Sequence, residues 1–138
     1  MARILTLTLN PALDLTIRLG TLQPGAVNRS HAQHSHAAGK GLNVAQVLAD
    51  LGHSVTVGGF LGQDNLQPFE ALMARRGFAD CFVRVPGETR SNLKLVEGDG
   101  RVTDINGVGP QVDEHAQGEL LARLQHLASG HDAVVVAG

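Results

Sequence analysis

The sequence predicts an α/β fold built on a mostly parallel sheet. Three segments rich in β-branched and aliphatic residues have the pattern of buried strands: RILTLTL at 3–9, SVTVGGF at 54–60 and DAVVVAG at 132–138. Segments with helical periodicity lie between them, which is the order of parallel strands and their crossover helices. The 138 residues are 43% hydrophobic and 17% charged, as expected for one globular domain.

The first helix is predicted to begin after Gly41 and to stop at Gly52. Its inward face is expected at positions i, i+3, i+4 and i+7, which are Val44, Val47, Leu48 and Leu51. A second helix is predicted over residues 65–76, with Asp64 as its N-cap and Gly77 as its stop. Its inward residues are Phe69, Leu72 and Met73. A third helix is predicted over residues 113–128, and CFVRV at 81–85 is predicted to be a further strand.

Two pairs of segments lie outside this strand–helix rhythm. Residues 12–19 alternate between apolar and polar side chains, and the polar segment 27–37 contains no residue that would break a second strand. Residues 91–96 and 101–106 flank EGDG, which is a hairpin signal. These segments predict a second, smaller antiparallel sheet with one solvent-exposed face.

The ending AVVVAG has the pattern of a central strand. Ligand sites in open α/β sheets lie beyond the carboxyl ends of such strands, and a helix normally covers the strand that leads to them. We therefore expect the chain to be the front part of a longer protein.

Composition argues against several classes of partner. The net charge is −2, no Trp or Tyr is present, and no apolar run reaches membrane-spanning length, so neither nucleic acid nor a membrane is an expected partner. The single cysteine, Cys81, suits a reducing cytosol and is expected to be a packed hydrophobe rather than a nucleophile. Among the seven histidines, His34 and His36 would share one face of a strand, but no acidic or cysteine partner completes a metal site for them.

The motif HAAGKGLN at 36–43 places a glycine–lysine–glycine at the start of a helix. It lacks the Ser or Thr and the first glycine of a Walker loop, and it lacks the third glycine of the dinucleotide fingerprint. Gly39 and Gly41 still leave backbone amides accessible, the helix start carries partial positive charge, and Lys40 adds a full charge. With Asn43 as donor and acceptor, the motif suits a hydroxylated, anionic ligand.

Five motifs in order resemble the PfkB group of ribokinase-like carbohydrate kinases: TLNPALDL, AAGKGLNVA, GGFLGQD, TRSNLKL and VVVAG. The resemblance runs along the whole chain and is strongest to the bacterial 1-phosphofructokinase branch, with tagatose 6-phosphate kinases next. It implies a ribokinase-like sheet with a small β-lid near residues 12–37 and 90–106, and residues 1–138 would be the N-terminal part of one kinase domain.

The resemblance also implies roles for individual residues. Asp14 would take a sugar hydroxyl, and Gly39, Lys40 and Asn43 would lie against the sugar. The residues Arg90, Asn92 and Lys94 would hold the phosphate already on the substrate; they otherwise make a basic exposed edge that discourages strand pairing.

The expected reaction is transfer of the ATP γ-phosphoryl group to the 6-hydroxyl of fructose 1-phosphate, giving fructose 1,6-bisphosphate. Tagatose 6-phosphate or fructose 6-phosphate is the alternative acceptor, and a non-catalytic sugar-phosphate-binding or dimerisation module is the alternative class. No G-A-G-D motif is present, so no residue of the chain is expected to be the catalytic base, and ATP and Mg²⁺ would bind mainly through further sequence. A cytoplasmic homodimer joined through the β-lid is expected.

Overall fold

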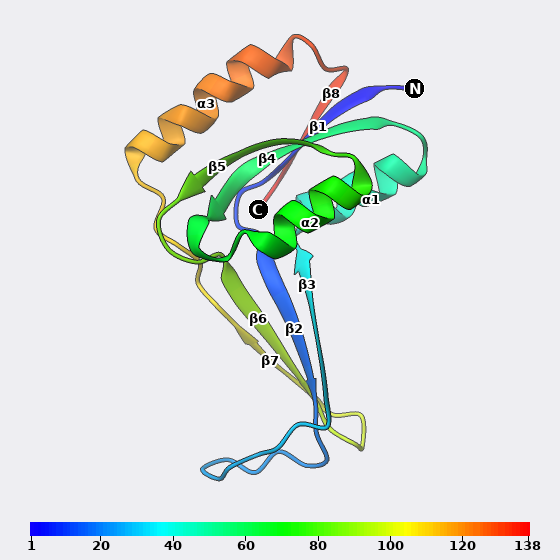
Figure 1. Cartoon of the computed structure of the whole chain (residues 1–138), viewed down its shortest axis with the longest axis vertical. Helices are drawn as coiled ribbons and strands as arrows, with labels where there is room; N and C mark the ends of the chain where they lie inside the picture. Colours follow the sequence, from blue (N-terminus) through cyan, green and yellow to red (C-terminus); the bar gives the residue numbers. More distant parts are fainter.

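The computed structural model describes all 138 residues as two sheets and three α-helices (Figure 1). The main sheet holds β1 (Arg3–Thr8), β4 (Ser54–Gly62), β5 (Ala79–Val85) and β8 (Ala133–Ala137). The small sheet holds β2 (Ala12–Arg18), β3 (Ala32–Ala38), β6 (Arg90–Val96) and β7 (Val102–Asn106). The helices are α1 (Lys40–Asp50), α2 (Gln67–Arg76) and α3 (Glu114–Ala128), and a 3₁₀ turn η1 (Gln63–Asn65) precedes α2.

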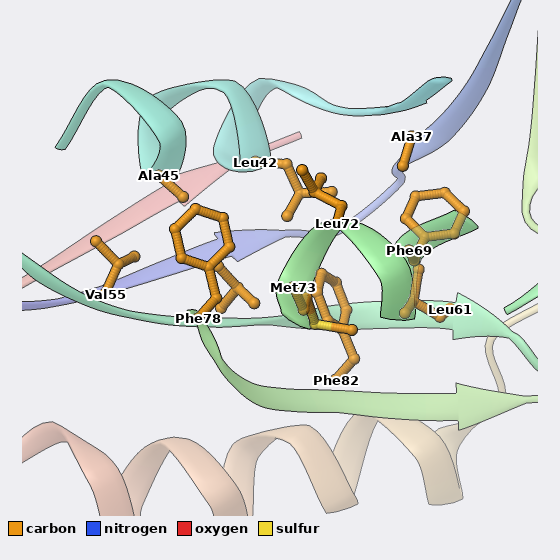
Figure 2. Packing of buried hydrophobic residues seen from close by; sticks show 11 residues of the cluster. Ala37, Leu42, Ala45, Val55, Leu61, Phe69, Leu72, Met73, Phe78 and Phe82 are labelled. Carbon is orange, nitrogen blue, oxygen red and sulfur yellow. The ribbon is translucent and has the colours of Figure 1, made fainter. Parts of the chain in front are cut away.

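The main sheet has the order β5-β4-β1-β8, and all its pairs are parallel. Helices α1 and α2 cover one face and α3 covers the other (Figure 1). Figure 2 shows the larger core, in which side chains of α1 and α2 meet those of β4 and β5. This mostly parallel, helix-flanked sheet confirms the predicted fold class.

Helix α1 uses a different face from the predicted one. Its buried residues are Gly41, Leu42 and Ala45, whereas Val47 and Leu51 are 58% and 68% exposed. Only Leu48 of the predicted face packs against the core. The cause lies at Gly41, where an added Cβ would be 2.3 Å from Thr8 Oγ1. The helix can therefore approach β1 only through its small residues.

The start of α2 also corrects the prediction. Asp64 lies in η1 and caps nothing, because α2 begins after Leu66 and carries a proline, Pro68, in its first turn. The predicted end is confirmed, since Gly77 adopts the left-handed conformation with φ 69°. The predicted inward residues of α2 are all buried: Phe69, Leu72 and Met73. Asp113 caps α3 by accepting a hydrogen bond from Ala116 N at 2.8 Å.

The small sheet projects from the carboxyl end of the main sheet and has the order β3-β2-β6-β7 (Figure 1). Its two outer pairs are antiparallel, as expected, but the central pair β2–β6 is parallel, so the sheet is mixed rather than antiparallel. The reason is connectivity: β2 follows β1 and β6 follows β5, and both parent strands run in the same direction. Residues 27–31, predicted to be part of a strand, lie outside β3.

Strand β8 occupies an edge of the main sheet rather than its centre. It pairs only with β1, and Val134 and Val136 remain exposed. The sequence pattern of β8 is apolar on both faces, but β8 has only one neighbouring strand in this structure.

No helix combines the length and apolarity that a membrane span requires.

Candidate functional site

The polar face of the small sheet brings together residues from all four strands. Directly paired residues point to the same face, so Asp14 of β2 lies between His36 of β3 and Asn92 of β6. One row further out, Thr16 lies between His34 and Lys94 in the same way. The face encloses a basin of about 270 Å³ with one apolar residue in its lining. Its lining residues are Asp14, Thr16, His36, Asn92, Leu93, Lys94, Asp104 and Asn106.

Arg90 lies on the same face at the end of the small sheet nearest the main sheet. Its Nη1 is 3.4 Å from Asn92 Oδ1 and 3.4 Å from the Gly107 carbonyl oxygen, both of which are long hydrogen bonds. Its Nε is buried and has no partner. Arg90 has no carboxylate partner, and a guanidinium can donate two parallel hydrogen bonds to an anionic group.

The backbone just before Arg90 is held firmly to the main sheet. Thr89 is buried, and its hydroxyl accepts a hydrogen bond from Gly62 N at 2.9 Å. An added Cβ at Gly62 would lie 2.3 Å from Thr89 N, so only glycine allows the end of β4 to approach the start of β6 this closely. The position of Arg90 is therefore set by rigid elements rather than by a mobile loop.

Helix α1 begins directly after β3, beside the row that contains Arg90. Ala38 pairs with Ala12, and Ala12 pairs with Arg90 on its other side. Gly39 is the N-cap with φ 149°; the helix has no side-chain cap and no acidic residue in its first turn. No side chain therefore competes for its first N–H groups, and Lys40 and Asn43 are exposed beside them.

Lys94 differs from the other predicted phosphate ligands. Its ammonium lies 2.7 Å from Asp104 Oδ1, and both side chains are about half exposed. It also lies one row further from the main sheet than Asn92. Lys94 would have to leave this ion pair, or share it, to bind a substrate phosphate.

Five lining residues of the basin were not predicted: Thr16, His36, Leu93, Asp104 and Asn106. The alternation of VTDIN at 102–106 could have indicated the last two, but only the β6–β7 register places them opposite Lys94 and Asn92. His36 was expected on a strand face without an acidic partner, yet its Nε2 is 3.7 Å from Asp14 Oδ2.

The groups with shifted pKa values lie on β5, away from the basin. Burial raises the pKa of the Cys81 thiol, which fits the expected unreactive cysteine. Burial opposes ionisation of Asp80, but its hydrogen bonds to Arg84 and to Phe82 N leave the pKa of that carboxyl below its usual value. The same pairing with Asp80 raises the pKa of Arg84. Asp80 and Arg84 form a structural ion pair on the edge strand β5.

The fold and the site together define a doubly covered α/β sheet that carries a smaller sheet with a polar ligand face. The pfkB family carbohydrate kinase model matches residues 7–138, and the chain belongs to this family.

Two bacterial 1-phosphofructokinases are similar to the chain in sequence. The chain is 50% identical to 1-phosphofructokinase of Vibrio cholerae over 136 residues, which is 99% of this chain and 43% of the relative. It is 43% identical to 1-phosphofructokinase of Haemophilus influenzae over 138 residues, covering 100% of this chain and 44% of that protein. The chain thus spans less than half the length of these relatives.

Solved structures show the same fold. A possible 1-phosphofructokinase from Thermotoga maritima superposes with a TM-score of 0.83 at 32% identity, covering 99% of this chain and 44% of that one. Phosphofructokinase-2 from Escherichia coli, solved in complex with fructose-6-phosphate, superposes with a TM-score of 0.85 at 28% identity, covering 100% and 46%.

Proposed function

We propose that residues 1–138 are the N-terminal part of a kinase domain that phosphorylates the 6-hydroxyl of fructose 1-phosphate. The observation that carries the proposal is the shared polar face on which Asp14 and Asn92 are direct neighbours and Arg90 reaches Asn92. A carboxylate and an amide in one row, with a guanidinium in the next row of the same face, match a ligand with both hydroxyl groups and a phosphate. The names of the two bacterial relatives favour the same substrate.

In this proposal each residue has a distinct role. Asp14 accepts a hydrogen bond from a sugar hydroxyl, and Asn92 binds the phosphate of the substrate together with Arg90. Gly39 lets the ligand approach the free N–H groups of α1, while Lys40 and Asn43 contact the sugar from the first turn. Lys94 adds positive charge at the outer end of the basin once it turns from Asp104.

ATP and Mg²⁺ are the co-substrate and metal that the family implies, and the side chains of this chain do not fit a Mg²⁺ site. Asp104 is neutralised by Lys94, Asp14 faces His36, and no three His, Cys, Asp or Glu side chains gather elsewhere. In this proposal ATP and Mg²⁺ bind mainly through further sequence, which also supplies the base that takes the proton from the attacking hydroxyl. The isolated 138-residue chain is expected to be inactive.

The experiment is steady-state kinetics on a protein of the relatives' length that begins with this chain. Turnover of fructose 1-phosphate, tagatose 6-phosphate and fructose 6-phosphate is compared, with ATP and Mg²⁺ present. The largest kcat/KM is expected for fructose 1-phosphate, and Lys40→Ala and Asn43→Ala should raise the KM for the sugar phosphate more than the KM for ATP. A larger effect on the KM for ATP, or a preference for another acceptor, contradicts the assignment. Binding of fructose 1-phosphate without turnover would favour the non-catalytic module.

The second face of the small sheet supports a homodimer as the assembled form. Alternate residues of β2 on this face are Leu13, Leu15 and Ile17, and Leu93 and Leu95 of β6 lie beside them. Ile105 on β7 is 52% exposed. An apolar sheet face of this kind is normally covered, and a second copy of the same face would cover it. Sedimentation of the longer protein tests this. One phosphofructokinase-2 structure from Escherichia coli is described as a tetrameric inhibited form, so a tetramer is the other outcome.

A further inference from the structure

His36 carries an inference that deepens the proposed function and rests on it. We infer that His36 is a positioning residue for Asp14, fixing the carboxylate so that one oxygen faces the sugar hydroxyl. The two residues are direct partners in the β2–β3 register, and their side chains project from the same face. His36 Nε2 lies 3.7 Å from Asp14 Oδ2.

The geometry leaves both groups free to close this gap. The His36 side chain is 66% exposed and that of Asp14 is 40% exposed, and neither forms a hydrogen bond with another side chain. A change of well under 1 Å would bring Nε2 within hydrogen-bonding distance of Oδ2. Such contacts are often long before the substrate is present and shorten when it excludes water.

The consequence concerns the two oxygens of Asp14. When Nε2–H donates to Oδ2, the plane of the carboxylate is fixed and Oδ1 remains as the acceptor for a sugar hydroxyl. Without His36 the carboxylate could rotate, and part of the binding energy would be spent on ordering it. His36 therefore acts through Asp14, and its effect should appear in the binding of the sugar and not in that of ATP.

The same strand provides a matched control. His34 lies two residues earlier on the same face and is likewise exposed, but its direct partner is Thr16, which carries no charge. A general effect of histidine on this strand, through solubility or strand propensity, would be the same at both positions. An effect through the carboxylate would occur only at His36.

The experiment compares His36→Ala, His36→Gln and His34→Ala in the protein of the relatives' length. His36→Ala is expected to raise the KM for fructose 1-phosphate about three- to tenfold, the range for one charge-assisted hydrogen bond at a half-exposed site. The KM for ATP should stay unchanged. His36→Gln, whose side-chain N–H can replace Nε2–H, should recover most of the loss, and His34→Ala should behave as the wild type. Thermal unfolding of each variant reports that the fold is intact.

A double-mutant cycle with Asp14→Asn tests the route of the effect. If His36 acts through the charged carboxylate, most of the loss caused by His36→Ala should disappear in the Asp14→Asn background. The inference is overturned if His36→Ala raises the KM for fructose 1-phosphate as much in the Asp14→Asn background as in the wild type. It is also overturned if His36→Ala and His34→Ala raise that KM equally. Failure of the wild type to turn over any of the three sugar phosphates contradicts the proposed function instead. In that case the effect of His36→Ala is measured as a change in the affinity for fructose 1-phosphate, by calorimetric titration.

Discussion

Asn65 and Thr89 are joined by two reciprocal hydrogen bonds across the junction of the two sheets. The Asn65 side-chain amide donates to the Thr89 carbonyl oxygen at 2.9 Å, and its oxygen accepts from Thr89 N at 2.8 Å. The 3₁₀ turn after β4 is thus hydrogen-bonded to the residue that precedes Arg90. This contact links the stability of the main sheet to the placement of the proposed phosphate ligand.

Asn65→Ala should lower the free energy of unfolding by about 2 kcal/mol, because two partly buried backbone groups lose their partners at about 1 kcal/mol each. It should also raise the KM for the sugar phosphate, since Arg90 is then held less firmly. Denaturant unfolding and steady-state kinetics measure the two effects. Gln63→Ala in the same turn is the control and should be close to neutral, because the Gln63 side chain is exposed and forms no hydrogen bond. Equal effects of both variants would contradict the role of the Asn65 clamp.

Gly41→Ala should destabilise the protein by at least about 2 kcal/mol, because the new Cβ would lie 2.3 Å from Thr8 Oγ1 and 2.7 Å from the Leu7 carbonyl oxygen. Gly118→Ala in α3 provides the contrast. Gly118 is an exposed helical residue with nothing within 4 Å of an added Cβ, so alanine should stabilise by about 0.5–1 kcal/mol. Chemical denaturation gives both values. Changes of the same sign would show that helix propensity, and not the approach of α1 to β1, dominates at Gly41.

Arg90→Ala should raise the KM for the sugar phosphate more than Lys94→Ala does. Arg90 has a buried, unpartnered Nε and only long hydrogen bonds, whereas the Lys94 ammonium is already paired with Asp104. Kinetics of the two single variants test this order. Asp104→Asn frees Lys94 and should lower that KM or leave it unchanged, while changing stability by less than about 1 kcal/mol because the pair is exposed. A larger loss from Lys94→Ala would place the phosphate at the outer end of the basin.

The Asp80–Arg84 pair predicts a contribution to stability that depends on acid pH. The folded-state pKa of Asp80 lies below its usual value, so the pair stabilises the fold above the pKa of an unfolded aspartate, about 3.9, and this contribution is lost as the pH falls through the folded value. The amount should be no more than about 1 kcal/mol at this partly exposed site. Unfolding of the wild type and of Asp80→Asn, measured between neutral pH and pH 3, should show curves that converge toward low pH. Parallel curves would contradict the prediction.

The order of strands and helices could be predicted because each has its own local pattern. The apolar run of β1 and the left-handed end of α2 at Gly77 follow from a few neighbouring residues. The buried face of α1 could not be predicted from periodicity, because the deciding contact is between Gly41 and Thr8 of another element. The parallel pairing of β2 with β6 depends likewise on the connection of each strand to the main sheet.

The site also has a part that could be predicted from the sequence and a part that could not. The resemblance implied roles for Asp14, Arg90 and Asn92, and alternation along a strand placed Asn92 and Lys94 on one face. That Asp14 lies beside Asn92 depends on the register between strands separated by more than seventy residues. His36 joins the basin through the β2–β3 register, and Asn106 joins it through the β6–β7 register.

The sequence by itself determined the α/β class, most of the elements, and which residues carry charge and hydrogen-bonding groups suited to a sugar phosphate. These properties depend on side-chain chemistry and on periods of two and 3.6 residues, both of which are local. The tertiary structure alone decided which of those residues meet, which face of α1 is buried, and that Lys94 forms an ion pair while Arg90 forms only long hydrogen bonds. Those outcomes depend on register and close packing between distant segments, and no local pattern contains that information.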